Sequence, residues 1–212
     1  MTEFAVITIT LICLFLFWLG TGRYKHVMVF FLLWIGIVMT LSYIGFFTNT
    51  RSLPPRMLFV LLPSVLYVIY FYKKLKPGVL KQKYLVAIHT MRIPVELMLY
   101  RLYGEGRIPK IMTFEGWNFD ILMGITALLL LLHSLIFKQQ LQAIFFRIWN
   151  VAGLLFLSVI VITALVSAPS PIQLLAFEQP NIAILQFPFT LLPAVIVPLV
   201  LLSHLLGLKK KE

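Results

Sequence analysis

Charge is scarce in this sequence. Only 12% of its 212 residues are Asp, Glu, Lys or Arg, and 61% are hydrophobic, whereas a soluble globular domain has about 25% charged residues. A single soluble core of this length cannot bury so much apolar surface. We therefore expect lipid to be the solvent for most of the chain.

Motifs of well-known chemistry are also missing. The one cysteine, Cys13, excludes an intrachain disulfide. There is no P-loop, no GxSxG, no HExxH and no CxxC, so the common nucleotide-binding, hydrolase and zinc-protease signatures are absent. The sequence supports no known catalytic mechanism, and whether the protein is an enzyme stays open.

The charge that is present is strongly positive, with a net value of +11. Lys and Arg gather in short runs between apolar segments, which is typical of cytoplasmic loops that flank membrane spans. No basic face with interleaved aromatic residues appears, as a nucleic-acid-binding unit would show. We expect the lipid bilayer as a partner and no nucleic acid.

Long apolar runs fill most of the chain, and a membrane span needs about 20 mainly apolar residues. Six segments meet this requirement, and a seventh is more polar. The expected spans cover residues 4–19, 27–47, 57–72, 84–103, 119–137, 143–166 and 182–206. Since no repeat and no linker interrupts them, the sequence predicts an all-α, polytopic membrane helix bundle in which residues 1–212 form a single transmembrane domain.

The distribution of Lys and Arg indicates whether segment 84–103 crosses the membrane. If it crosses, one side carries eleven of these residues and the other carries five; if it lies along the surface, the split is eleven against seven. Because cytoplasmic loops are enriched in Lys and Arg, we favour seven spans, an outside N-terminus and a cytoplasmic C-terminus. Three of the expected cytoplasmic lysines are Lys138, Lys210 and Lys211. The expected location is the cell membrane, the inner membrane if the protein is bacterial.

A polar stripe runs along segment 84–103. At 100° per residue, one helix face carries His89, Arg92, Glu96 and Tyr100. Charged residues inside a membrane helix face the bundle interior or a wet cavity. The stripe therefore predicts a functional polar site, and the alternative is a buried ion pair that only packs helices.

Two local features of this stripe have structural consequences. Glu96 lies four residues after Arg92, so we expect an i,i+4 ion pair that offsets the burial of both charges. Pro94 removes the backbone hydrogen bond to Thr90 and should leave a carbonyl between His89 and Arg92 without its donor.

Other polar residues add to the candidate pathway. Thr113 or Asn118 is expected to cap the start of the fifth span, and Asp120 is expected in its first turn, where the helix dipole favours a negative charge. Glu115, in the loop before them, is not explained by capping, and Asn150 in the sixth span needs a partner from another helix. We therefore add Glu115 and Asn150 to the predicted pathway for a substrate or proton.

Four histidines, His26, His89, His133 and His204, fall in the expected cytoplasmic half. Such a layer can ligate haem iron between two imidazoles or zinc among three. The metal-ligand candidates are His89, His133 and His204, although no two histidines are spaced i,i+4. Histidines that simply sit at headgroup level are the alternative, and the cofactor stays unknown.

The last span contains Pro188, Pro193 and Pro198. A proline inside a helix removes a hydrogen bond and kinks the axis. We expect weak points in the hydrogen-bond ladder of this span, as in the broken helices of transporters; a merely irregular helix is the alternative.

Three stretches, HTMRIPVEL, MTFEGWNFDILMGITA and FEQPNIAILQFPFTLLPAVIVPLVLLSHL, resemble an uncharacterised family of bacterial multi-pass membrane proteins. The likeness covers the chain from His89 onward. It implies a bacterial inner-membrane protein. Since the family has no assigned activity, it supplies no catalytic residues.

Three hypotheses about function remain. The leading one is an integral membrane protein with an intramembrane polar site on the fourth helix that binds or transports a small solute, an ion or a proton. The second is a membrane-embedded haem- or metal-dependent enzyme that uses the histidine layer. The third is a non-catalytic assembly subunit. Neither the substrate nor the oligomeric state follows from the sequence.

Overall fold

The computed structural model describes residues 2–137 and 142–209, and in these residues the chain forms helices and loops without any strand. The predicted all-helical fold is confirmed. Among the described residues, four helices are long and apolar enough to cross a membrane: α1 (Thr2–Gly20), α2 (Lys25–Tyr43), α6 (Asp120–Phe137) and α7 (Ala143–Val166). The predictions for Lys138, Lys210 and Lys211 concern residues outside the described ranges.

The other helices are shorter. They are α3 (Leu58–Lys74), α4 (Gln82–Thr90), α5 (Arg92–Gly104) and α8 (Val197–Leu208), and a π-helical turn, η5 (Leu192–Ile196), leads into α8. Single 3-10 turns occur at η1 (Phe46–Thr48), η2 (Pro77–Val79), η3 (Lys110–Met112) and η4 (Ala183–Leu185). The predicted helix 84–103 is thus two helices, and the predicted helix 182–206 is regular only in its second half.

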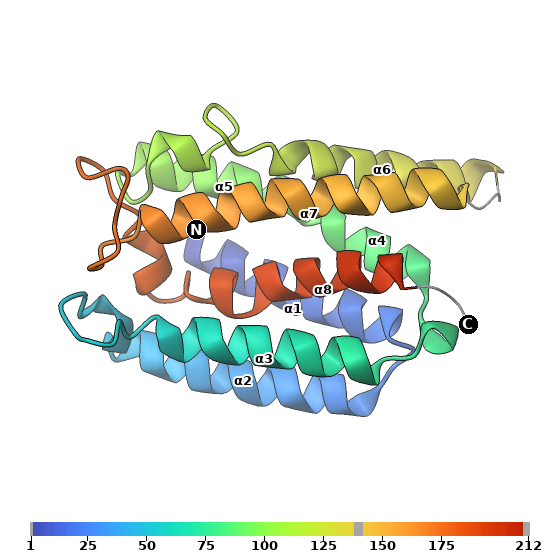
Figure 1. The fold of residues 1–212 in the computed structure, drawn as a ribbon, viewed down its shortest axis with the longest axis horizontal. Coiled ribbons are helices and arrows are strands. Elements are labelled where there is room, and N and C mark those ends of the chain that lie inside the picture. The colour runs from blue at the N-terminus through green and yellow to red at the C-terminus, as the bar shows by residue number, and fades with distance from the viewer. Residues whose placement is uncertain (1, 138–141, 210–212) are drawn as a thin grey trace.

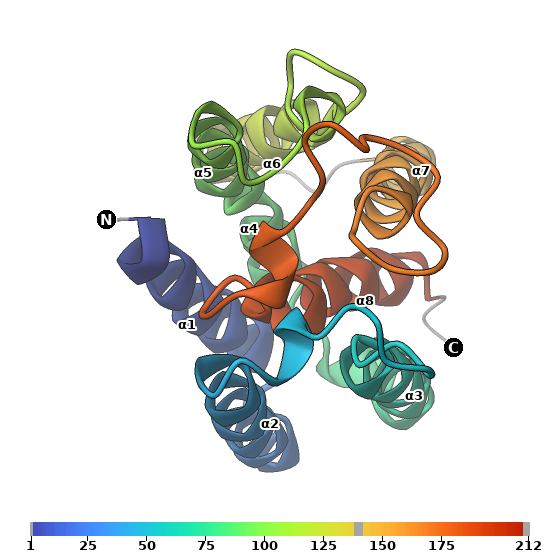
Figure 2. The same cartoon turned by 90° about the vertical axis from the view of Figure 1, so that its left-hand side faces the viewer.

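The helices lie side by side along the long axis of the molecule (Figure 1). α1, α3, α6 and α8 run in one direction, whereas α2, α7 and the pair α4 and α5 run in the other. α8 packs against α3, α4 and α7 and lies in the interior of the bundle when viewed from the end (Figure 2). The loops between α5 and α6 and between α7 and η5 lie at the same end.

The break between α4 and α5 falls at Met91, three residues before Pro94. Pro94 has no N–H to donate to the carbonyl of Thr90, so the helical ladder is interrupted there. It resumes when the N–H of Val95 bonds to the carbonyl of Met91 at 3.2 Å. The segment 84–103, expected as one helix, is therefore broken at Met91, which the sequence did not predict.

The π-helical turn has the same origin. Pro198 cannot donate to the carbonyl of Ala194, and two side chains from other helices replace the missing donor. Trp34 Nε1 and Tyr67 Oη donate to this carbonyl at 2.9 and 2.7 Å. The predicted weak point in the last helix is confirmed. The two hydrogen bonds to the carbonyl of Ala194 hold α2 and α3 against the centre of the bundle.

Candidate functional site

A cluster of polar side chains is buried where α4, α5 and α6 meet α7 and α8. Each member exposes 5% of its surface or less. We call this set the polar cluster: His89, Arg92, Glu96, Asn118, Asp120, Asn150 and His204. Buried polar groups are expected to satisfy one another by hydrogen bonds, so the partners of each decide what the cluster can do.

Arg92 forms its salt bridge with Asp120, the first residue of α6. Its Nη1 lies 3.1 Å from Asp120 Oδ1. The N-terminal end of a helix favours a negative charge, which also stabilises the carboxylate of Asp120. This corrects the predicted i,i+4 pair between Arg92 and Glu96.

The physical reason for the correction is the close approach of α6 to α5. Gly124 faces α5 so closely that a Cβ at this position would lie 2.7 Å from Ile93 Cγ1 and 3.1 Å from Ile93 N. The absence of a side chain lets the first turn of α6 enter the bundle beside Arg92. Asp120 therefore reaches the guanidinium, which spacing along one helix cannot reveal.

Glu96 is held by a neutral amide. Asn118 Nδ2 lies 2.7 Å from each carboxylate oxygen of Glu96 and 3.0 Å from the carbonyl oxygen of Met112. The Oδ1 of Asn118 accepts from the N–H of Asp120 at 3.1 Å. Asn118 thus caps α6, as predicted, and also positions Glu96, which was not predicted.

His204 joins α8 to the cluster. Its Nε2 lies 3.3 Å from Arg92 Nη2, and its Nδ1 lies 2.9 Å from Asn150 Oδ1. Because a guanidinium nitrogen only donates, Nε2 must accept and Nδ1 must carry the proton that it donates to Asn150. The contacts thereby assign the tautomer of His204, and they supply the partner on another helix that Asn150 was predicted to need.

The imidazole of His89 stacks on that of His204, with ring centroids 3.9 Å apart and planes 26° from parallel. The indole of Trp149 meets His89 edge-on at 5.2 Å. Gly153 leaves room for this stack, since a Cβ there would lie 2.2 Å from His204 Cε1 and Nε2. The pair is therefore packed tightly between α4, α7 and α8.

Two polar atoms of the cluster, His89 Nδ1 and Arg92 Nε, are buried and have no hydrogen-bond partner within residues 2–137 and 142–209. Unsatisfied buried polar groups are unusual in proteins. They mark a position where water or a small polar ligand would find partners.

Tyr100 and Glu115 lie apart from the polar cluster. Tyr100 Oη donates to Glu115 Oε1 at 2.9 Å, and Lys110 Nζ lies 3.6 Å from Glu115 Oε2. Tyr100 is 40% exposed. Of the six predicted pathway residues, His89, Arg92, Glu96 and Asn150 come together, and Tyr100 and Glu115 form a separate pair.

The histidines do not gather into one layer of ligands. His133 packs against Phe137 and His26 against Tyr24, with ring centroids 4.8 and 5.0 Å apart. His89 and His204 face each other through their ring faces, whereas an imidazole nitrogen binds a metal in the plane of its ring. Both ring nitrogens of His204 already contact Arg92 and Asn150. Over the part of the chain that the structure describes, no three His, Cys, Asp or Glu side chains are grouped as metal ligands.

Sequence reasoning underestimated three residues. Asn118 and Asp120 were interpreted as helix caps, and His204 as a metal candidate rather than a partner of Arg92. The signal for Asp120 was its unusual place, a carboxylate at the start of an apolar helix. That place fits both a cap and a buried ion pair.

Residues 54–210, most of the chain, match the model of a family described as a domain of unknown function (DUF8737). All members of the polar cluster lie within the matched residues. No curated protein and no solved structure matches the chain.

Proposed function

The chain belongs to the DUF8737 family, and we propose that it is a multi-pass membrane protein that binds a proton at Glu96 and couples this binding to the movement of a small solute or ion. The support is the polar cluster itself. Ionisable residues inside membrane helices mark proton relays and substrate pathways.

The charges of the cluster carry the proposal. One guanidinium faces two carboxylates, and Arg92 is already paired with Asp120. Glu96 has Asn118 as its hydrogen-bond donor, which is neutral. The cluster is electrically neutral when Glu96 holds a proton and negative when it does not, so protonation is a change of net charge inside a buried site. Glu96 can exchange its proton without breaking the salt bridge.

The contacts of the polar cluster also offer a path along which a proton can leave Glu96. Asn118 links Glu96 to the first turn of α6, Asp120 links to Arg92, and Arg92 contacts His204. The unpartnered Nδ1 of His89 and Nε of Arg92 supply sites for bridging water along this line. In our proposal, the histidine pair passes protons between this line and the other end of the bundle.

The orientation we propose has seven spans, formed by α1, α2, α3, α4 with α5, α6, α7, and η5 with α8. The end that holds the α1–α2 and α3–α4 loops carries Arg23, Lys25, Lys73, Lys74, Lys76, Lys81, Lys83 and Lys209. The opposite end carries fewer basic residues, namely Arg51, Arg56, Arg101, Arg107 and Lys110. By the positive-inside tendency, the first end is cytoplasmic, with the N-terminus outside, as in a bacterial inner membrane.

Infrared spectroscopy of the purified protein tests the proton site without knowledge of the substrate. We expect a pH-dependent band of a protonated, buried carboxyl group that is lost in Glu96→Gln. Glu115→Gln, which alters an exposed carboxylate, is the matched control and should keep the band. A band that persists in Glu96→Gln overturns the assignment of the proton to this residue.

Coupling is tested by complementation of a deletion strain. Glu96→Gln keeps the shape of the side chain and an oxygen that accepts from Asn118, so the protein should fold with an unchanged unfolding midpoint. We expect it to lose the phenotype, whereas Glu115→Gln retains it. Full complementation by Glu96→Gln favours the third hypothesis, a subunit in which the cluster only packs helices.

A further inference from the structure

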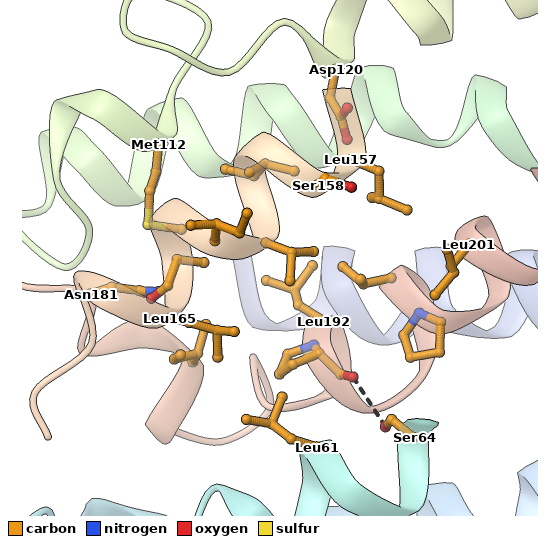
Figure 3. A pocket seen from close by; sticks show the side chains of 18 of the residues that line it. Leu61, Ser64, Met112, Asp120, Leu157, Ser158, Leu165, Asn181, Leu192 and Leu201 are labelled. Carbon is orange, nitrogen blue, oxygen red and sulfur yellow. Dashed lines mark hydrogen bonds between the residues drawn. The ribbon is translucent and has the colours of Figure 1, made fainter. Parts of the chain in front are cut away.

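A pocket of about 500 Å³ lies between α3 and α7, beside the polar cluster (Figure 3). Both helices pack on α8, which forms the floor of the pocket together with the π-helical turn. Most of the lining is aliphatic, including Leu61, Leu157, Leu165, Leu192 and Leu201. Its volume falls in the range of about 300–1,000 Å³ that is usual for sites that bind small molecules.

The pocket opens on the outer surface of the bundle. Val65 and Ile69 of α3 and Ile162 of α7 line it and are 57%, 47% and 60% exposed. Exposed aliphatic side chains on a helix proposed to span the membrane face lipid tails. A ligand can therefore enter sideways from the bilayer.

The polar atoms of the lining are acceptors. Glu96 and Asp120 contribute carboxylates, and Asn181 contributes an amide whose Nδ2 donates to the carbonyl of Ala164 at 3.2 Å. This bond fixes the orientation of the amide and leaves Asn181 Oδ1 buried, with no partner among the described residues. The hydroxyls of Ser64 and Ser158 already donate to the carbonyls of Pro193 and Leu154.

We propose that this pocket binds a membrane amphiphile with a long hydrocarbon chain and an uncharged or cationic head that donates a hydrogen bond, namely a hydroxyl or amine. Asn181 Oδ1 accepts from the head, and the aliphatic walls hold the chain. An anionic head such as a fatty-acid carboxylate is disfavoured, because it has no donor for Asn181 Oδ1 and would be buried without a cationic partner; Arg92 is already paired with Asp120. This binding does not depend on proton exchange at Glu96.

Equilibrium binding of radiolabelled 1-hexadecanol to the purified protein in detergent tests the proposal. We expect saturable binding, and hexadecyl methyl ether, which has no donor, should compete about tenfold less well, the effect of one hydrogen bond. Hexadecanoate at pH 8 should compete at least tenfold less well than 1-hexadecylamine. Equal competition by the alcohol, the ether and the carboxylate would mean simple partitioning and overturns the proposal.

Two neighbouring residues of α7 supply a matched pair of variants. Ser158 lines the pocket and Val159 does not, and both are exposed. Ser158→Phe should fill the pocket and weaken hexadecanol binding about tenfold or more, whereas Val159→Phe should bind as the wild type does. Equal binding by the two variants rules out this pocket. The infrared band assigned to Glu96 should persist in both, so either proposal can fail without the other.

Discussion

Arg92 pairs with Asp120, which lies 28 residues further along the chain, although Glu96 stands one turn away on the same helix. The pairing joins α5 to the first turn of α6. The two carboxylates of the polar cluster therefore have different partners. Asp120 is bound to the cation Arg92, and Glu96 is bound to the neutral amide of Asn118.

Removing one partner of the buried salt bridge should be far more damaging than removing both. Arg92→Met leaves Asp120 buried without its cation, so we expect a loss of about 3–5 kcal/mol in the free energy of unfolding. Arg92→Met/Asp120→Leu should recover most of that loss. Arg101→Met, at an exposed salt bridge with Glu105, should change stability by about 1 kcal/mol or less. Denaturant unfolding in detergent measures all three, and a double variant as unstable as Arg92→Met would contradict this view.

The second prediction concerns the space left by Gly153. An added Cβ would overlap the imidazole of His204, so Gly153→Ala should displace the ring from Asn150 and lower stability by about 1–3 kcal/mol. Gly36→Ala is the control, because a Cβ there meets nothing within 4 Å and alanine favours a helix. Thermal unfolding compares them. The combination with His204→Ala should be milder than the sum of the single changes; strict additivity would show that the overlap is not the cause.

The third prediction concerns the carbonyl of Ala194, which Pro198 leaves without a helical donor. Trp34→Phe or Tyr67→Phe alone removes one of two donors and should lower stability by about 0.5–1.5 kcal/mol. The double variant leaves the carbonyl unsatisfied, so its loss should exceed the sum. Tyr70→Phe, at an exposed position of α3, the helix that carries Tyr67, should leave stability unchanged. A strictly additive double variant, measured by denaturant unfolding, would show that the two donors do not share this acceptor.

The fourth prediction is the orientation in the membrane. Reporter fusions after Lys138 and at the C-terminus should report the cytoplasm, and fusions at Gly116 and Pro171 should report the outside. A C-terminus on the outside would overturn the seven-span arrangement and place the histidine pair near the opposite surface.

Periodicity and composition were enough to predict an all-helical chain and the polar face of segment 84–103. The irregularity of the last helix also followed, because a proline acts locally on its own helix, whereas the break at Met91 did not. The partners of the polar residues did not follow. Which carboxylate reaches Arg92 depends on the approach of α6 at Gly124, a contact between segments far apart in the sequence.

The same limit explains the histidines. Their expected depth suggested a common layer, but depth says nothing about position around the bundle axis. His89 and His204 meet because α4 and α8 are neighbours. His133 and His26 instead pack against nearby aromatic residues of the chain, Phe137 and Tyr24.

The carbonyl of Ala194 sets an order of assembly. Trp34 reaches it across 160 residues of sequence and Tyr67 across 127, so both donors are synthesised long before their acceptor exists. Contacts this distant in the chain form late, after the intervening loops have closed. In the proposed seven-span arrangement, α2 and α3 are therefore present with an indole and a phenol that lack this acceptor until the last helix is added.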